Sequence, residues 1–262
     1  MTSQSPPRYY STLRPFRDLL EGGGGILTYH HIGPRPRGAR LRGLYVSSNL
    51  FARQLSELTE AGFAGADYNQ VTSSPGPNQR RIFITFDDGF RDVFEQATPL
   101  LRASGFSAIQ FLVADLLGQT SAWQAASGEI PGQLMDRAEI TDWLAAGNRI
   151  GSHTLRHPFL TRVTEELARE EISASKKKLE DLFSIPIDHF CYPYGDWNPR
   201  IREMVREAGY RTACITASGV NSTASDPWSL VRLTARYPSR NWRNFRAWLT
   251  RIFGPESHQR TA

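Results

Sequence analysis

Short apolar blocks alternate along the chain with longer amphipathic blocks, and this pattern predicts strands that are each followed by a helix. Runs rich in β-branched and aromatic residues predict strands at 26–30, 82–86, 107–113, 149–152, 189–192, 211–216 and 228–232. Apolar residues at helical spacing, bounded by capping residues and glycines, predict helices at 48–62, 92–103, 136–146, 164–183 and 198–209. Such regular alternation is typical of βα repeats around a mostly parallel sheet.

The segments outside these blocks are irregular by composition. We expect an N-terminal arm with a glycine-rich joint at 1–25, one domain at 26–253 and a polar tail at 254–262, because 262 residues suit one large α/β domain. The stretches at 72–78 and 118–132 are expected to be loops, the second containing Trp123. Arginines and aromatic residues interleave at 236–251, which predicts an amphipathic helix that either packs on the domain or makes weak contact with a membrane or an anionic glycan.

Composition and charge narrow the class of protein without identifying a partner. The net charge is +5 and the pI is about 9.4, but no nucleic-acid-binding motif accompanies them, so we expect no nucleic-acid partner. Cys191 and Cys214 have neither the CxxC spacing of a thiolate metal site nor the number of a disulfide framework. No apolar run is long enough for a membrane span and no secretory signal is visible at 1–20, so we expect a cytoplasmic protein.

The strand predicted at 82–86 ends at two adjacent carboxylates, Asp87 and Asp88, which Gly89 follows. Asp-Gly is a common turn dipeptide, so a plain turn is one interpretation. Unpaired charges are costly to bury within a strand. The two carboxylates therefore belong at the carboxyl end of the strand, where α/β folds build their ligand sites.

A second group of candidate ligands follows the strand at 149–152. His153 and His157 are four residues apart, and two histidines at this spacing can reach one metal ion, with a carboxylate such as Asp88 as a third ligand. Three protein ligands leave an open coordination position for water, as catalytic zinc sites require. An isolated HxxxH pattern is often a surface feature, but its combination with the Asp-Asp strand end favours a metal site.

Three stretches of the chain carry a family resemblance. They are Thr85-Phe-Asp-Asp-Gly89, His153-Thr-Leu-Arg-His157 and Tyr192-Pro-Tyr-Gly195, in that order. They resemble the first three motifs of the polysaccharide deacetylases, the NodB-homology carbohydrate esterases of family 4, and the resemblance spans about residues 26 to 233. It implies an α/β fold, a distorted or incomplete (β/α) barrel. Barrel active sites lie at the carboxyl ends of the strands, where the candidate residues are predicted to fall.

The resemblance also implies a division of catalytic roles. Asp88, His153 and His157 would hold a divalent metal, with zinc expected and cobalt, manganese or nickel as alternatives. Asp87 would take a proton from the attacking water as general base. The backbone N–H of Tyr194 would help to bind the oxyanion.

Two further roles depend on how this chain matches the family. A Tyr-His pair that ends at His30 resembles the poly-N-acetylglucosamine deacetylase branch, in which the N-terminal histidine is the general acid, and His31 is expected on the opposite side of the strand. Most members carry an arginine where this chain has Cys191, and that arginine holds the catalytic carboxylate. We expect Arg232 to supply the guanidinium instead, the alternative being an ordinary arginine beside a strand.

Other residues near the same face are candidates for substrate binding. Aromatic platforms suit the apolar faces of sugar rings, although core or lid packing is the alternative. The candidates are Tyr192, Pro193, Trp123, Trp197 and Trp228, with Trp197 preferred among the tryptophans. The arginines at 35, 37, 40 and 42 belong to a loop that is either solvated or an electropositive lip that attracts an anionic substrate.

These observations together predict a metal-dependent amide hydrolase that removes N-acetyl groups from an N-acetylglucosamine-containing glycan. A sugar N-deformylase or another N-acyl hydrolase would use the same residues. A non-catalytic glycan-binding relative is a third interpretation. The retention of Asp87 together with the three candidate metal ligands argues against it.

Overall fold

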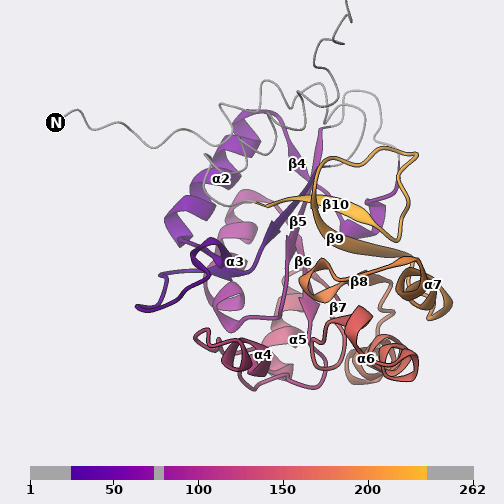
Figure 1. Cartoon of the computed structure of the whole chain (residues 1–262). Helices are drawn as coiled ribbons and strands as arrows, with labels where there is room; N and C mark the ends of the chain where they lie inside the picture. Colours follow the sequence, from indigo (N-terminus) through magenta and orange to yellow (C-terminus); the bar gives the residue numbers. More distant parts are fainter. Residues whose placement is uncertain (1–24, 74–79, 235–262) are drawn as a thin grey trace, which may run out of the picture.

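The structure is a computed structural model that describes residues 25–73 and 80–234. In this part of the chain, parallel strands form a barrel and helices pack around its outside (Figure 1). The predictions for 1–24, for the connection at 74–78, for the amphipathic helix at 236–251 and for the polar tail at 254–262 lie outside the described residues, as does the predicted C-terminal limit of the domain.

Seven strands of the described chain close the barrel. Their order is β1-β10-β9-β8-β7-β6-β5, and the ring closes because β5 also pairs with β1. Every pair in this ring is parallel. The strands are β1 (Gly25–Tyr29), β5 (Arg81–Phe86), β6 (Ala108–Leu112), β7 (Arg149–Ser152), β8 (His189–Cys191), β9 (Thr212–Ser218) and β10 (Leu230–Thr234). The predicted (β/α) barrel is confirmed, with fewer strands than the usual eight.

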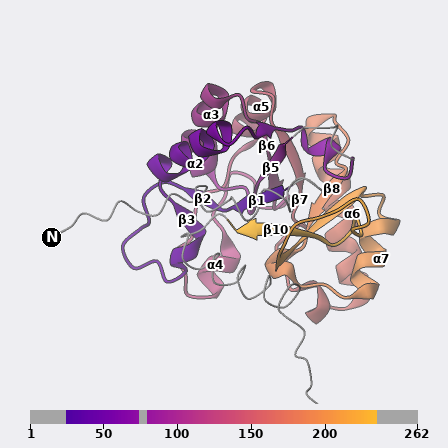
Figure 2. The ribbon, with the colours of Figure 1, turned by 90° about the horizontal axis from the view of Figure 1, so that it is seen from above.

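The helices and three short strands lie outside this ring. The helices are α2 (Ser48–Glu60), α3 (Arg91–Ser104), α4 (Ala122–Ala126), α5 (Arg137–Ala145), α6 (Glu165–Phe183) and α7 (Pro199–Glu207). The short strands are β2 (His31–Ile32), β3 (Tyr45–Val46) and β4 (Ala64–Gly65). Seen from above, α2, α3 and α5 cover one side of the barrel, and α6 and α7 cover another (Figure 2). None of the described helices is long and apolar enough to cross a membrane.

One segment differs from its prediction. Residues 118–132 were expected to be a loop, but they contain α4. The helix is only five residues long and no side chain caps its first turn. The sequence does place Ser121 and Gln124 at the spacing of a capping box, but a helix of five residues is too short for a repeated apolar spacing from which it could be predicted.

The barrel wall separates two apolar clusters, because successive strand residues point to opposite faces. In β5, Phe83 belongs to an inner cluster with Ile109 and Phe111, whereas Ile82 and Ile84 pack in the outer cluster. The inner cluster fills the barrel with apolar side chains. Polar side chains gather at and beyond the carboxyl ends of the strands, where Arg232 of β10 meets Thr85 of β5.

We expect His189, at the start of β8, to make stability depend on pH. Its ring is held between Thr212 and Asn69, and burial lowers its pKa from 6.5 to about 4. The unfolded chain thus binds a proton at a higher pH than the folded chain. The contribution of His189 to the free energy of unfolding is fully present above the pKa of the unfolded chain, 6.5. It is lost as pH falls toward the folded-state pKa of about 4, by up to about 3 kcal/mol in total.

Urea denaturation of wild-type protein and of His189→Gln, compared between about pH 7 and pH 4, measures this dependence. The variant is expected to lose part of the decline in stability at acid pH. An equal decline in both proteins would contradict the assignment to this histidine.

Candidate active site

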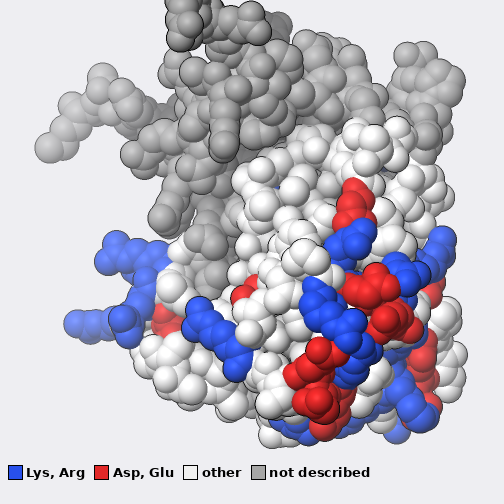
Figure 3. Space-filling model, turned by 45° about the vertical axis from the view of Figure 1, so that its right-hand side comes forward, with Lys and Arg blue, Asp and Glu red and all other residues white. Residues whose placement is uncertain are grey.

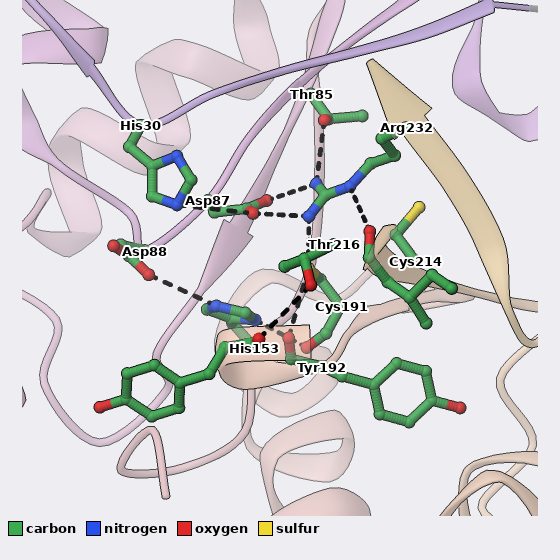
Figure 4. Close-up of polar contacts among 12 residues, drawn as sticks. His30, Thr85, Asp87, Asp88, His153, Cys191, Tyr192, Cys214, Thr216 and Arg232 are labelled. Carbon is green, nitrogen blue, oxygen red and sulfur yellow. Dashed lines mark hydrogen bonds and ion pairs between the residues drawn. The ribbon is translucent and has the colours of Figure 1, made fainter. Parts of the chain in front are cut away.

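A cavity of about 260 Å³ opens among the carboxyl ends of the barrel strands. Seven of the residues predicted from sequence line it, namely His30, Asp87, Asp88, His153, His157, Tyr192 and Tyr194. They follow β1, β5, β7 and β8, and they meet because these strands are parallel and end on the same side of the barrel. Figure 4 shows polar contacts of five of them, namely His30, Asp87, Asp88, His153 and Tyr192.

Asp88, His153 and His157 form one group of potential metal ligands. Their ligand atoms lie within 4.8 Å of one another, and all three residues are buried. Oδ1 of Asp88 is 3.3 Å from Nε2 of each histidine. Two imidazoles and one carboxylate are a donor set found in catalytic zinc sites, so these residues fit a divalent metal ion.

The protonation of this group also suits a metal. Nδ1 of His153 is 2.6 Å from the carbonyl oxygen of Cys191, and because a carbonyl only accepts, Nδ1 donates and Nε2 is the ring nitrogen that faces Asp88 and can bind a metal. Burial acts to raise the pKa of Asp88, but hydrogen bonds with the two histidines hold that pKa well below its usual range. Burial lowers the pKa of His157. A charged carboxylate and neutral imidazoles are the forms that bind metals.

The neighbouring carboxylate, Asp87, has a different partner. Nη1 and Nη2 of Arg232 donate to its two oxygens, each over 2.7 Å (Figure 4). The exposed fractions are 3% for Asp87 and 1% for Arg232. Burial acts to raise the pKa of Asp87, but the charge and hydrogen bonds of Arg232 keep it below the usual value. The bidentate contact fixes the orientation of an ionised carboxylate.

Arg232 is itself held by three neighbouring strands. Its guanidinium donates to Oγ1 of Thr85 over 3.1 Å and to the backbone carbonyl of Ile215 over 3.2 Å. Sγ of Cys191 lies 3.2 Å from Nη2. The small thiol of Cys191 leaves room for the guanidinium that enters from β10. The catalytic role of Arg232 stays a prediction.

His30 and His31 face different surroundings, as the alternation of a strand requires. Nε2 of His30 lies 3.9 Å from Oδ2 of Asp87, and the His30 side chain is 21% exposed, so a ligand in the cavity can reach it (Figure 4). Nδ1 of His31 lies 2.7 Å from Oδ2 of Asp92, and its ring stacks on Phe90. His31 is thus part of the packing against α3.

Backbone strain is concentrated at this cavity. In the described chain, five residues other than glycine have a positive φ, and four of them are Asp88 (77°), Thr154 (70°), His157 (66°) and Tyr194 (59°). Such conformations cost on the order of 1–3 kcal/mol each and persist only where the surrounding structure enforces them. Three of these residues, Asp88, His157 and Tyr194, line the cavity, and strain held at such a place favours the hypothesis of a functional site.

The turn after β8 carries Tyr194 into the cavity wall. Tyr194 is 43% exposed, and its ring stacks on Phe159 with a centroid separation of 3.8 Å. Pro193 is buried in the 3-10 turn Pro193–Gly195. A Cβ at Gly195 would overlap the side chain of Thr216 in β9, so glycine allows this turn to pack against the barrel.

The tryptophans occupy positions that differ in their access to the cavity. Trp197 and Trp228 do not line it: Trp197 packs 6.2 Å from the ring of Tyr192, and Nε1 of Trp228 donates to a backbone carbonyl. Trp123 does line it, and its ring stacks on His157 with centroids 4.4 Å apart. Sugar binding by Trp197 and Trp228 stays a prediction, and Trp123 is the tryptophan that a ligand in the cavity would meet.

Comparison with protein families assigns the chain. The family model described as polysaccharide deacetylase matches residues 74–213, which is more than half of the chain. The chain belongs to the polysaccharide deacetylase family. The resemblance drawn from the three sequence motifs is thereby confirmed.

Relatives within the polysaccharide deacetylases match with low identity. A chitooligosaccharide deacetylase of Azorhizobium caulinodans is 31% identical over 136 residues, which are 51% of this chain and 57% of that protein. A poly-β-1,6-N-acetyl-D-glucosamine N-deacetylase of Escherichia coli is 22% identical over an alignment of 278 positions, which covers 91% of this chain and 40% of that protein. The chain therefore spans about half the length of these two relatives.

A solved structure shows the same fold. IcaB from Ammonifex degensii superposes with a TM-score of 0.74 at 22% identity, over 87% of this chain and 97% of that one. At this identity the likeness supports the architecture of a deacetylase barrel. It does not by itself assign a substrate.

Sequence reasoning missed part of the cavity wall. The missed residues that line it are Leu41, Leu44, Gln124, Ser127 and Thr216. Leu41 is 53% exposed, and it lies between Arg40 and Arg42. A large apolar residue in an otherwise charged loop was the available signal, since such residues usually leave the solvent unless a ligand or partner meets them.

Proposed function

We propose that this protein is a metal-dependent hydrolase that removes N-acetyl groups from an N-acetylglucosamine-containing glycan. The observation that carries the proposal is that two adjacent carboxylates have different partners at one cavity. Asp88 faces two imidazoles, and Asp87 is paired with Arg232. The names of the two relatives, a chitooligosaccharide deacetylase and a poly-β-1,6-N-acetyl-D-glucosamine N-deacetylase, support an N-acetylated sugar as the substrate.

Hydrolysis of an N-acetyl amide needs activation of water, stabilisation of an oxyanion and protonation of the leaving amine. A divalent metal held by Asp88, His153 and His157, with zinc expected from the donor set, would polarise the amide carbonyl and lower the pKa of water. Asp87 accepts the proton of the water as the water oxygen bonds to the carbonyl carbon. Arg232 keeps that carboxylate ionised and oriented for this step.

Protonation of the leaving amine is assigned to His30. His30 donates a proton to the nitrogen as the C–N bond breaks, which releases acetate and a free amine. Its distance of 3.9 Å from Asp87 supports action on the same substrate, because both side chains face one cavity. The backbone N–H of Tyr194 is proposed to stabilise the oxyanion, in a turn whose backbone is held at a positive φ.

The test is acetate release from N-acetylglucosamine oligomers by the chelated protein, before and after zinc, cobalt or manganese is added. We expect chelation to abolish acetate release and one equivalent of metal to restore it, because the three ligands can hold a single ion. Metal content is measured alongside. Metal binding without acetate release, but with release of formate or another acid from an N-acyl sugar, would favour the alternative N-deformylase or N-acyl hydrolase. Failure to bind metal would overturn the proposed site.

A further inference from the structure

The segment between β2 and β3 carries four arginines beside the cavity. Arg35, Arg37, Arg40 and Arg42 are all exposed. None of them forms an ion pair with another residue of the described chain. We call residues 35–42 the cationic lip. Four guanidinium groups without ion pairs, within eight residues, create a positive electrostatic potential at this part of the surface.

Hydrogen bonds fix the backbone of the cationic lip at its base and in its middle. At the base, β2 pairs with β3, and the N–H of Gly33 donates to the carbonyl of Val46 over 2.8 Å. In the middle, the carboxylate of Glu129 accepts from the backbone N–H groups of Arg40 and Leu41, over 2.9 and 2.6 Å. Glu129 is only 6% exposed, so these are buried, charge-assisted hydrogen bonds. The lip therefore has a defined position.

That position is the mouth of the active-site cavity. Leu41 and Leu44 line the cavity together with His30 and Asp87. Arg40 and Arg42 are the sequence neighbours of Leu41, and consecutive Cα atoms are about 3.8 Å apart. Neither arginine lines the cavity itself, so a substrate would meet their guanidinium groups where it extends out of the cavity over this edge.

Glu129 contributes one negative charge against the four positive charges of the cationic lip, and the carboxylates inside the cavity have partners of their own. Asp87 is paired with Arg232, and Asp88 faces two imidazoles. Elsewhere on the protein, many basic side chains have acidic partners, as where α6 and α7 interleave both signs of charge on the surface shown in Figure 3. The unpaired arginines of the lip contrast with that arrangement.

We propose that the cationic lip binds an anionic group, a carboxylate or a phosphate, on a sugar next to the one that is deacetylated. The substrate class is then an anionic glycan rather than a neutral one. Guanidinium groups suit carboxylate and phosphate because their donors match the paired oxygens of both. This inference rests on the proposed function and adds to it the charge of the glycan.

The experiment compares matched oligosaccharides with the metal-loaded full chain. A neutral N-acetylglucosamine oligomer is set against the same oligomer carrying one carboxylate and, in a separate arm, one phosphate. The variants are the double substitution Arg40→Gln and Arg42→Gln, and the control Arg102→Gln, whose exposed arginine lies in the last turn of α3 before β6 begins. Acetate release and direct binding by calorimetry are both measured.

We expect the wild type to prefer an anionic oligomer, and the arm that shows the preference identifies the anion. The double variant should raise KM for that oligomer about fivefold, since each exposed contact between an arginine and the anion contributes on the order of 0.5 kcal/mol. KM for the neutral oligomer should not change. Raising the salt concentration should remove the preference, because exposed charges are screened. Arg102→Gln should behave as wild type.

Three outcomes would overturn the proposed role of the cationic lip. The first is equal KM values for neutral and anionic oligomers in the wild type, and the second is an equal rise in KM for both oligomers in the double variant. The third is lip-dependent binding to vesicles of anionic phospholipid without binding to the oligomers. The proposed function fails separately. If no oligomer releases acetate while calorimetry still shows a lip-dependent preference for the anionic one, the anion-binding role of the lip is supported and the proposed hydrolase activity is contradicted.

Discussion

Asp87→Asn is expected to lower kcat/KM for acetate release by about 10²–10⁴-fold, the range that a general base contributes. Asparagine has almost the same shape as aspartate and still offers an oxygen to Arg232, but it cannot accept the proton of the attacking water. The carboxylate is buried and oriented by two hydrogen bonds from Arg232, so no other described side chain is equally placed to replace it. Steady-state acetate release by the zinc-loaded protein measures the loss.

The adjacent residue provides the matched control. Asp88→Asn removes a carboxylate of the same size, but one that faces His153 and His157. We expect this variant to lose metal as well as activity, whereas Asp87→Asn should retain one equivalent of metal. Retained activity in Asp87→Asn, or loss of metal from it, would contradict the division of roles between the two carboxylates.

The barrel was predictable from the sequence because its signals are local. Runs of β-branched and aromatic residues gave the strands, and capping residues gave the helix starts, as with Asp136 and Glu139 in the capping box of α5. The parallel order then follows from alternation of the two elements. The metal-ligand group was predictable for a related reason, since Asp88, His153 and His157 each follow a strand directly and must emerge on one edge.

The contact between Asp87 and Arg232 spans 145 residues, and no local pattern encodes it. It was anticipated only because Cys191 stood where the family carries an arginine, which left a buried carboxylate in need of a cation. The structure supplies what the sequence lacked, namely that β10 lies between β9 and β1 and turns Arg232 into the barrel.

The walls of the cavity were harder to predict because they come from connections rather than strands. Trp197 and Trp228 follow or precede strands closely, yet they do not line the cavity. Trp123 reaches it from α4, and Leu41 reaches it because Glu129 holds the backbone of the lip. Tertiary hydrogen bonds of this kind leave no periodic trace in a sequence. The same holds for the positive φ of Asp88, which a sequence does not reveal.

Arg232→Ala is expected to destabilise the fold as well as the reaction. Removing the guanidinium leaves the carboxylate of Asp87 buried without a counter-charge, and breaking a buried pair in this way costs about 3–5 kcal/mol. Urea denaturation measures the loss of unfolding free energy. Arg232→Lys should lose less unfolding free energy, because lysine keeps the positive charge. It should still lose some, because an ammonium group lacks the planar pair of donors that matches both carboxylate oxygens.

The double variant separates this cause from simple loss of packing. If the cost arises from an uncompensated carboxylate, Arg232→Ala should destabilise the Asp87→Asn protein by about 1–3 kcal/mol less than it destabilises the wild type. Equal costs in both backgrounds would assign the effect to lost packing and hydrogen bonds with Thr85 and Ile215. Full turnover in Arg232→Ala would exclude any part for this arginine in orienting the base. A coupling of the expected size, together with lost turnover, would tie the stability of the barrel interior to the charge that catalysis requires.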